Sequence, residues 1–340
     1  MSRTSDQKPN DPPRLSSIIV SHNAGNDLDR CVASILGQSD VIEVIVVDNG
    51  SMDGSVDRVR RDHPEVRVVS NGLNDGYAGG ANRGASAATA NVLLFLNADI
   101  VLEPGCVDAL LDALAAPGGA ICAPLVVASD GGLVEYGFTV DWAGDLIGLT
   151  APGLSLYVSG CALATTRSVF TALGGFDAEY FMFCEDLDLC WRALLSGYEV
   201  RVTPEARVRH RGGASTPGGY VRDGRVEVTS FRIALRERNT LATLVRCAPA
   251  GWAALVIPFR LARLIGIAIV AVISGRPRLA VELALGVTWN IRRLPRLYSE
   301  RRRMNVSAQS RRRVLKERVR RDIVSWRVLL RHGLPHFVDR

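Results

Sequence analysis

From residue 15 onward, short runs of β-branched and other apolar residues alternate with segments of helical periodicity. Strands are predicted at residues 15–21, 43–48, 66–70 and 92–97. Between the first two strands, apolar residues recur at the spacing of one amphipathic helix, with Asn26 at its N-terminal cap position. Strands that alternate with helices in this way form βαβ units, so the chain is predicted to be an α/β protein with a mostly parallel sheet.

Polar residues follow each of the first two predicted strands. Ser21, His22 and Asn23 end the first, and Asp48 and Asn49 end the second. The carboxyl edge of such a sheet is where ligands bind in open α/β folds. Both position and residue type therefore mark these residues as site candidates.

The composition fits an intracellular globular protein. With 340 residues, 47% of them hydrophobic, the chain can form one large domain with an appendage or two smaller ones. Residues 1–14 are polar and proline-rich, which predicts a flexible tail and not a secretory signal, so the protein is expected in the cytoplasm. The 7 cysteines lack any paired framework spacing and are expected to be buried thiols.

The composition changes after about Ser230. Residues 252–274 are strongly apolar, broken by Pro258, Arg260 and Arg263, and arginine-rich segments follow. A spanning helix needs roughly 20 apolar residues. Three alternatives stay open: an interfacial or re-entrant membrane contact, a true span, or a pair of helices packed on the rest of the chain.

Most of the excess positive charge lies in the C-terminal part of the chain, after the apolar stretch. The formal net charge is +6, and arginines are concentrated in the segment that follows the apolar stretch. Stacking aromatic residues are sparse there, so nucleic acid is not expected as a partner. Anionic lipid headgroups fit an arginine cluster beside an apolar helix better.

A buried strand at 92–96 delivers Asn97, Ala98 and Asp99 to its carboxyl end. A hard cation such as Mg²⁺ or Mn²⁺ binds through one or two protein groups plus substrate phosphate oxygens, so one well-placed carboxylate can suffice. The alternative is that Asp99 is an ordinary strand-end aspartate.

Further downstream, Glu185, Asp186 and Asp188 stand at the expected start of a helix, directly after an aromatic run. Acids in a first helical turn can simply favour the helix dipole. The apolar residues on both sides instead predict a partly desolvated carboxylate, whose raised pKa suits a general base. Residues 201–216 are expected to form a basic, glycine-containing loop segment. Within it His210, near Gly212 and Gly213, is either a further metal ligand or a structural histidine.

The glycine-rich segment 74–84 enters a helix, which suggests phosphate binding. It has neither dinucleotide nor P-loop spacing and does not follow the first strand, so it argues only weakly for a nicotinamide cofactor. An NAD(P)-type oxidoreductase is nevertheless kept as the alternative α/β enzyme, and an inactive nucleotide-sugar-binding protein as the alternative without catalysis.

Taken in order, five motifs resemble those of the family 2 inverting glycosyltransferases, especially their bacterial rhamnosyltransferase-like branch. The motifs are residues 18–23, 46–55, 76–84, 97–99 and 185–186. The resemblance implies a GT-A fold, a Rossmann-like nucleotide-binding mixed sheet flanked by helices, over residues 15–246. Residues 1–14 are then a disordered tail, and residues 247–340 a helical, basic and apolar extension that associates with a membrane.

The resemblance also implies roles for individual residues. Asp186 is expected to be the catalytic base, with Glu185 as the first acid of the same motif. Asp99 and His210 are expected to hold Mg²⁺ or Mn²⁺, with Asn97 standing where the family carries the first acid of its metal motif. The expected donor-binding residues are Ser21, Asn23, Asp48, Gly79, Gly80, Asn82 and Asn97.

The implied reaction is a metal-dependent, in-line transfer that inverts the anomeric carbon. The branch suggests dTDP-rhamnose as the donor, and UDP-sugars such as UDP-galactofuranose as the next candidates. It suggests a lipid-linked or cell-envelope polysaccharide as the acceptor. The enzyme is expected at the inner face of the cell membrane as a peripheral protein, and a homo-oligomer is compatible with this assignment.

Overall fold

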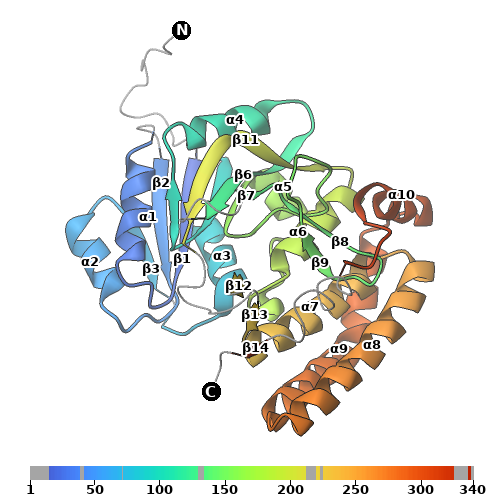
Figure 1. The fold of residues 1–340 in the computed structure, drawn as a ribbon. Coiled ribbons are helices and arrows are strands. Elements are labelled where there is room, and N and C mark those ends of the chain that lie inside the picture. Colours follow the sequence, from blue (N-terminus) through green and yellow to red (C-terminus); the bar gives the residue numbers. More distant parts are fainter. Residues whose placement is uncertain are drawn as a thin grey trace.

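A central mixed sheet organises the computed structural model (Figure 1), which describes residues 15–38, 42–70, 72–128, 134–211, 220–222, 225–324 and 336–337. Its strands, within these residues, are β1 (Leu15–Ser21), β2 (Ile42–Asp48), β3 (Arg67–Ser70), β4 (Val92–Asn97), β5 (Ile100–Leu102), β6 (Gly119–Ala128), β7 (Val134–Glu135), β10 (Ala162–Thr166) and β11 (Glu199–His210). The order is β3-β2-β1-β4-β10-β6-β11-β5, with β7 paired to β6.

The direction of the strands changes in the middle of the sheet. Strands β3, β2, β1 and β4 run parallel, whereas β10 is antiparallel to both β4 and β6. The α/β prediction is therefore confirmed, with a mixed sheet whose parallel half comes first in the chain. Smaller pairings join β8 (Phe138–Val140) to β9 (Leu146–Gly148), and β13 (Arg225–Val228) to β12 (Tyr220–Arg222) and β14 (His336–Phe337).

Helices cover both faces of the sheet. They are α1 (Asp27–Leu36), α2 (Ser55–Asp62), α3 (Gly76–Ala87), α4 (Cys106–Ala115), α5 (Arg167–Ala172), the 3₁₀ turn η1 (Ala178–Tyr180) and α6 (Glu185–Leu195). Alternate residues of β1 and β4 face opposite cores: Ile18 and Phe95 pack with α3, α5 and α6, while Ile19 and Leu96 pack with α1, α2 and α4. Burial on both faces explains why these strands read as continuous apolar runs.

Two local predictions need correction. Asn26 does precede α1, but its side chain makes no capping hydrogen bond. Residues 201–216 were expected to form a basic loop, yet β11 extends through His210 and pairs with β6 and β5, while residues 212–216 lie outside the described residues. Apolar residues Val200, Ala206 and Val208 are buried there while the arginines between them stay more exposed, so the basic residues mark the outer side of a strand.

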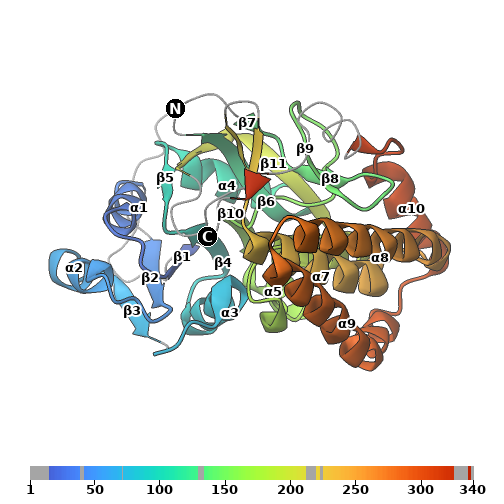
Figure 2. The same cartoon turned by 60° about the horizontal axis from the view of Figure 1, so that its bottom comes forward.

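The C-terminal part is helical. It comprises α7 (Ser230–Cys247), α8 (Ala250–Ile273), α9 (Pro277–Arg303) and α10 (Ala308–Arg318). Helices α8 and α9 form a hairpin that lies beside α7 and extends away from the sheet (Figures 1 and 2). The first turns of α8 pack into the main core through Trp252 and Val256, so the extension is attached to the α/β part by apolar contacts.

The two arginines inside the apolar helix α8 are ion-paired to the rest of the protein. Arg260 is 2% exposed and lies 3.0 Å from Asp145 and 2.7 Å from Glu237, and Arg263 lies 2.6 and 2.8 Å from the same two residues. Within the described residues, α8 is the helix long and apolar enough to cross a membrane, and 22% of its most apolar window is buried.

The predicted burial of the cysteines is confirmed. All 7 are buried and free, and they lie on strands, helices and loops spread over the molecule. Burial raises the pKa of several of these thiols, which keeps them protonated and unreactive.

Candidate active site

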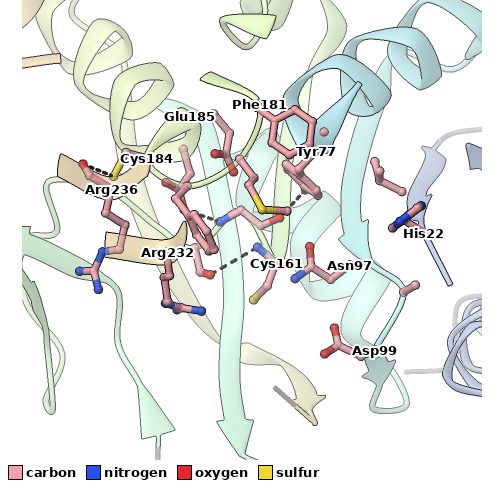
Figure 3. Close-up of a pocket in the computed structure, with 18 of the residues that line it drawn as sticks. His22, Tyr77, Asn97, Asp99, Cys161, Phe181, Cys184, Glu185, Arg232 and Arg236 are labelled. Atoms are coloured by element: carbon pink, nitrogen blue, oxygen red, sulfur yellow. Dashed lines mark hydrogen bonds between the residues drawn. The ribbon is translucent and has the colours of Figure 1, made fainter. Parts of the chain in front are cut away.

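A cavity of about 720 Å³ opens at the carboxyl ends of the first strands of the sheet (Figure 3). His22 follows β1, Asn49 follows β2, Asn97 ends the adjoining strand β4, and Asp99 comes two residues later; all four line it. The start of α6 forms another wall, and its volume lies in the range of small-molecule sites. The ends of these three strands and the α6 carboxylates thus meet at one cavity although they are far apart in the chain.

Strand pairing brings Asp99 and His210 together on one side of this cavity. His210 is opposite Ile100 in the β5–β11 pair, and the Arg211 N–H donates to the Asp99 carbonyl at 3.2 Å. As a result, His210 Nε2 lies 3.4 Å from Asp99 Oδ1. Burial lowers the pKa of His210, but the hydrogen bond and charge of Asp99, helped by Glu135, outweigh it and raise the pKa overall.

This pair fits a hard divalent cation only as a two-ligand site. Among the described residues, no cluster of three or more His, Cys, Asp or Glu side chains could hold a metal. Mg²⁺ and Mn²⁺ ordinarily keep several positions for water and phosphate oxygens, so one carboxylate and one imidazole at the cavity wall are compatible with them.

The opposite wall is built by a strained loop that leads into α6. Phe181, Phe183 and Cys184 have φ values of 64°, 67° and 64°, a region that side chains other than glycine seldom adopt. This backbone turns the first residues of α6 toward the cavity, where Glu185 and Asp186 line it. Residues held in such conformations cluster at functional sites.

Asp186 is fixed in place by backbone donors. Its Oδ2 accepts from the Gly160 N–H at 2.8 Å, and its Oδ1 accepts from the Leu187 N–H at 2.7 Å. Burial nevertheless dominates and raises the pKa of Asp186 above that of an ordinary aspartate. A rigid carboxylate with a raised pKa has the properties of a general base.

Glu185 and Asp188 have different environments although they lie on the same first turns. Glu185 is 6% exposed, and burial, followed by the charge of Asp186, raises its pKa well above the usual value. Asp188 is fully buried and lies 2.7 Å from both Arg192 and Arg246. Burial would raise the pKa of Asp188, but these two guanidinium groups lower it, so Asp188 joins α6 to α7 as a permanent anion.

The residues predicted to bind the donor at the first two strands lie beside the cavity, not on its wall. Ser21 is fully buried, and its hydroxyl has no partner among the described residues. Asn23 and Asp48 connect the loops after β1 and β2: Asn23 Oδ1 accepts from the Met52 N–H, and Asp48 Oδ1 accepts from the Ser51 N–H, both at 2.8 Å.

The predicted residues of the glycine-rich segment are used for packing on α3. A Cβ on Gly80 would stand 2.8 Å from Val20 Cγ1, and one on Gly79 2.7 Å from Asp75 Cβ, so both positions require close approach. The Asn82 amide is engaged by the Phe176 backbone, with contacts of 2.8 and 3.0 Å. Earlier residues of this segment, Asn74, Gly76 and Tyr77, line the cavity instead.

Sequence reasoning missed the contribution of α7. Phe231, Arg232 and Arg236 line the cavity, and Asn239 holds the strained loop from behind. The fully buried Asn239 amide donates to the carbonyls of Tyr180, Met182 and Phe183 at 3.0, 3.0 and 2.7 Å. Arg232 and Arg236 stand one helical turn apart on one face, which was the signal available in the sequence.

Comparison with known proteins identifies what the chain is similar to. Residues 16–172 match the model of Glycosyl transferase family 2. The chain is 29% identical over 238 residues to N-acetylglucosaminyl-diphospho-decaprenol L-rhamnosyltransferase of Mycobacterium tuberculosis, covering 59% of this chain and 77% of that one. It is also 29% identical over 276 residues to the pre-mycofactocin glycosyltransferase of that organism, covering 77% and 56%.

Solved structures support the same fold. A mannosyltransferase from Pyrobaculum calidifontis in complex with GDP-Man and Mn²⁺ superimposes with a TM-score of 0.52 at 20% identity, covering 89% of this chain and 88% of that one. GalNAc-T7 with UDP, GalNAc and Mn²⁺ gives a TM-score of 0.57 at 17% identity, covering 72% and 49%. The predicted GT-A fold is thereby confirmed.

Proposed function

Because the chain belongs to glycosyl transferase family 2, we propose that it catalyses an inverting, metal-dependent transfer of rhamnose from dTDP-rhamnose to a lipid-linked acceptor. The observation that carries this proposal is that Asp99 with His210 and Asp186 line one cavity from different walls. A carboxylate suited to proton removal and a two-ligand cation site at the same cavity are what the transfer requires.

The chemistry follows from this arrangement. Asp186, held by the Gly160 and Leu187 N–H groups, accepts the proton of the acceptor hydroxyl. The acceptor oxygen then attacks the anomeric carbon as the nucleoside diphosphate leaves from the opposite face, so the configuration inverts. Asp99 and His210 would hold the cation, which when bound supplies positive charge to the departing diphosphate.

The donor side of the proposal rests on the first strands. Asn97 lines the cavity beside Asp99. Ser21, Asn23, Asp48, Gly79, Gly80 and Asn82 support the loops and the helix around it, and their assignment as donor-binding residues stays a prediction. Rhamnose and a diphosphate-linked lipid acceptor are supported by the similarity to the mycobacterial rhamnosyltransferase.

Membrane association is proposed for the α8–α9 hairpin. Its apolar side chains are unusually exposed for a protein surface: Leu255, Ile265, Ile269, Val272, Ile273, Val281 and Leu285 are 54–80% exposed. Exposed apolar patches of this kind mark interaction sites. The hairpin would place the enzyme on the inner face of the membrane as a peripheral protein, with residues 247–340 as the attached extension.

The test is a transfer assay with a panel of nucleotide sugars, using membrane extract as the source of acceptor, with Mn²⁺ or with EDTA. We expect transfer from dTDP-rhamnose, its loss on chelation, and an inverted anomeric configuration of the product by NMR. Transfer that persists in EDTA would reject metal dependence, and a retained configuration would reject Asp186 as base.

Two alternatives are tested with the same nucleotide sugars, one by thermal shift and one by the transfer assay. Thermal shift with nucleotide sugars against NAD separates the glycosyltransferase from an oxidoreductase, and stabilisation by NAD alone would reject the proposal. Nucleotide-sugar binding without any turnover across the panel would instead support an inactive binding protein.

A further inference from the structure

Helix α7 presents a cation to the cavity that the proposed reaction does not use. Arg236 lines the cavity on the face of α7 that also carries Arg232. The other charged residues nearby on α7 have protein partners: Glu237 pairs with Arg260 at 2.7 Å, and Arg238 donates to the Tyr180 carbonyl at 2.8 Å. Among the described residues, the Arg236 guanidinium has no hydrogen-bond or ion-pair partner.

An unpaired guanidinium in a partly enclosed site favours an anionic ligand. Arginine presents a planar set of donors that matches phosphate oxygens in pairs, and such charge-assisted hydrogen bonds are among the strongest in proteins. The Arg236 cation therefore indicates that a molecule entering this part of the cavity carries a negative group.

Position assigns this anion to the acceptor and not to the donor. The Arg236 carbonyl accepts from Cys184 Sγ at 3.9 Å, so Arg236 stands beside the residue that precedes Glu185. Figure 3 shows Arg236 and His22 at opposite sides of the pocket, with Glu185 between them. In an in-line displacement the acceptor approaches from the side of the base, opposite the departing diphosphate.

Helix α8 is ion-paired to residues beside this cavity: Glu237, the residue after Arg236, lies 2.7 Å from Arg260 and 2.8 Å from Arg263. Asp145, which precedes the cavity-lining Leu146, lies 3.0 Å from Arg260 and 2.6 Å from Arg263 of α8. Phe259, the neighbour of Arg260, is 40% exposed. The helix that carries these exposed apolar side chains is therefore ion-paired to the residue that follows Arg236.

From these observations we propose that Arg236 binds a phosphate group that links the acceptor sugar to a hydrocarbon chain. This inference rests on the proposed function, which already has a diphosphate-linked lipid as acceptor, and names the side chain that recognises its phosphate. The phosphate is recognised by Arg236, with Arg232 one turn away, and the hydrocarbon lies along α8.

Binding of short probes tests the inference independently of turnover. With saturating nucleoside diphosphate and Mn²⁺ present to occupy the donor side, farnesyl diphosphate, farnesol and inorganic diphosphate are titrated by calorimetry. We expect farnesyl diphosphate to bind more tightly than either of the others. Equal binding of farnesol would overturn anion recognition, and equal binding of inorganic diphosphate would overturn the role of the hydrocarbon.

The matched variants are Arg236→Gln, Arg236→Lys and Arg292→Gln, the last removing the same charge from an exposed position on α9. Arg236→Gln should weaken farnesyl diphosphate binding by about tenfold or more, the scale of one charge-assisted hydrogen bond. Arg236→Lys should recover part of this loss, and Arg292→Gln should have no effect.

Kinetics complete the test. Arg236→Gln should raise the acceptor KM for a diphosphate-linked sugar while leaving the KM for the same sugar on a neutral alkyl group unchanged. A rise in the donor KM instead would assign Arg236 to the donor and overturn the inference. If wild-type protein binds farnesyl diphosphate as expected but transfers no sugar, the proposed function fails while the phosphate site stands.

Discussion

Replacing Asn239 by alanine should separate catalysis from folding, because its amide holds the strained loop in front of Asp186. The Nδ2 group donates to three loop carbonyls at 2.7 to 3.0 Å in a fully buried position. Losing these bonds and leaving buried acceptors unpaired costs about 2–4 kcal/mol. Each of the three positive-φ residues stores about 1–3 kcal/mol of strain.

The stored strain is comparable to or larger than the restraint that Asn239 provides, so the loop should relax once the amide is gone. The Asp186 carboxylate would then move from its position against the acceptor hydroxyl. A displacement of about 1 Å costs roughly 100-fold in rate, so we expect kcat to fall by about that factor. Donor affinity should change less than kcat, because the loop touches the glycine-rich segment through one backbone hydrogen bond, from the Ala78 N–H to the Phe181 carbonyl at 3.1 Å, which Asn239 does not make.

Asn290→Ala provides the matched control. The Asn290 amide is 7% exposed and donates to the carbonyls of Arg238 and Gly286 at 2.9 and 3.0 Å, away from the strained loop. Both variants should lose stability in chemical denaturation, but only Asn239→Ala should lose kcat at a temperature where both are folded. An unchanged kcat in Asn239→Ala, or an equal loss in both variants, would refute the reasoning.

Three further predictions follow from charge and exposure. Because burial raises the pKa of Asp186 and only its anion accepts a proton, kcat/KM should fall on the acid side at a pH above the ordinary aspartate pKa of about 4; an acid limb at or below that value would contradict it. Asp188→Asn removes the carboxylate partner of Arg192 and one of those of Arg246, which keeps Asp177 and Glu300, so it should lower stability at neutral pH by about 3 kcal/mol in denaturant titration. Because those arginines lower the pKa of Asp188, its carboxylate stabilises the fold above its unfolded-state pKa, and this stabilisation is lost as the pH falls through the folded-state pKa. The free energies of unfolding of wild type and Asp188→Asn should therefore converge in acid, and a difference independent of pH would contradict this. Ile269→Ser combined with Ile273→Ser, at 55% and 80% exposed positions, should reduce sedimentation with anionic vesicles without lowering the unfolding temperature, and full retention of vesicle binding would argue against the hairpin.

The parallel half of the sheet could be predicted closely from sequence. Strands β1 and β4 have the predicted bounds because both of their faces are buried, which leaves continuous apolar runs with polar ends. Strand β11 was predicted as a loop because the segment is basic and glycines follow it, although the alternation of its arginines with apolar residues is a strand signal. Its pairing with β6 and β5 is non-local, and no signal within the segment itself specifies it.

The candidate site likewise has one part that local sequence signals predict and another that depends on tertiary packing. The meeting of Asp99 with Asp186 at one cavity follows from strand ends and a helix start, which leave local signals in the sequence. The contribution of Asn239 and Arg236 depends on how α7 packs against α6: the one-turn spacing of Arg232 and Arg236 can mark a shared helix face in the sequence, but not that this face meets the cavity. Asn82 shows the converse: its motif matches a donor-side loop, but tertiary structure engages its amide with the Phe176 backbone.

The most direct test of the account is to measure turnover and nucleotide affinity together in Asp186→Asn. This change keeps the size of the side chain and removes the proton-accepting anion beside Gly160. The account predicts that sugar transfer is lost while the nucleotide binds with wild-type affinity. Wild-type turnover in this variant would contradict the assignment of Asp186 as base and, with it, the proposed mechanism.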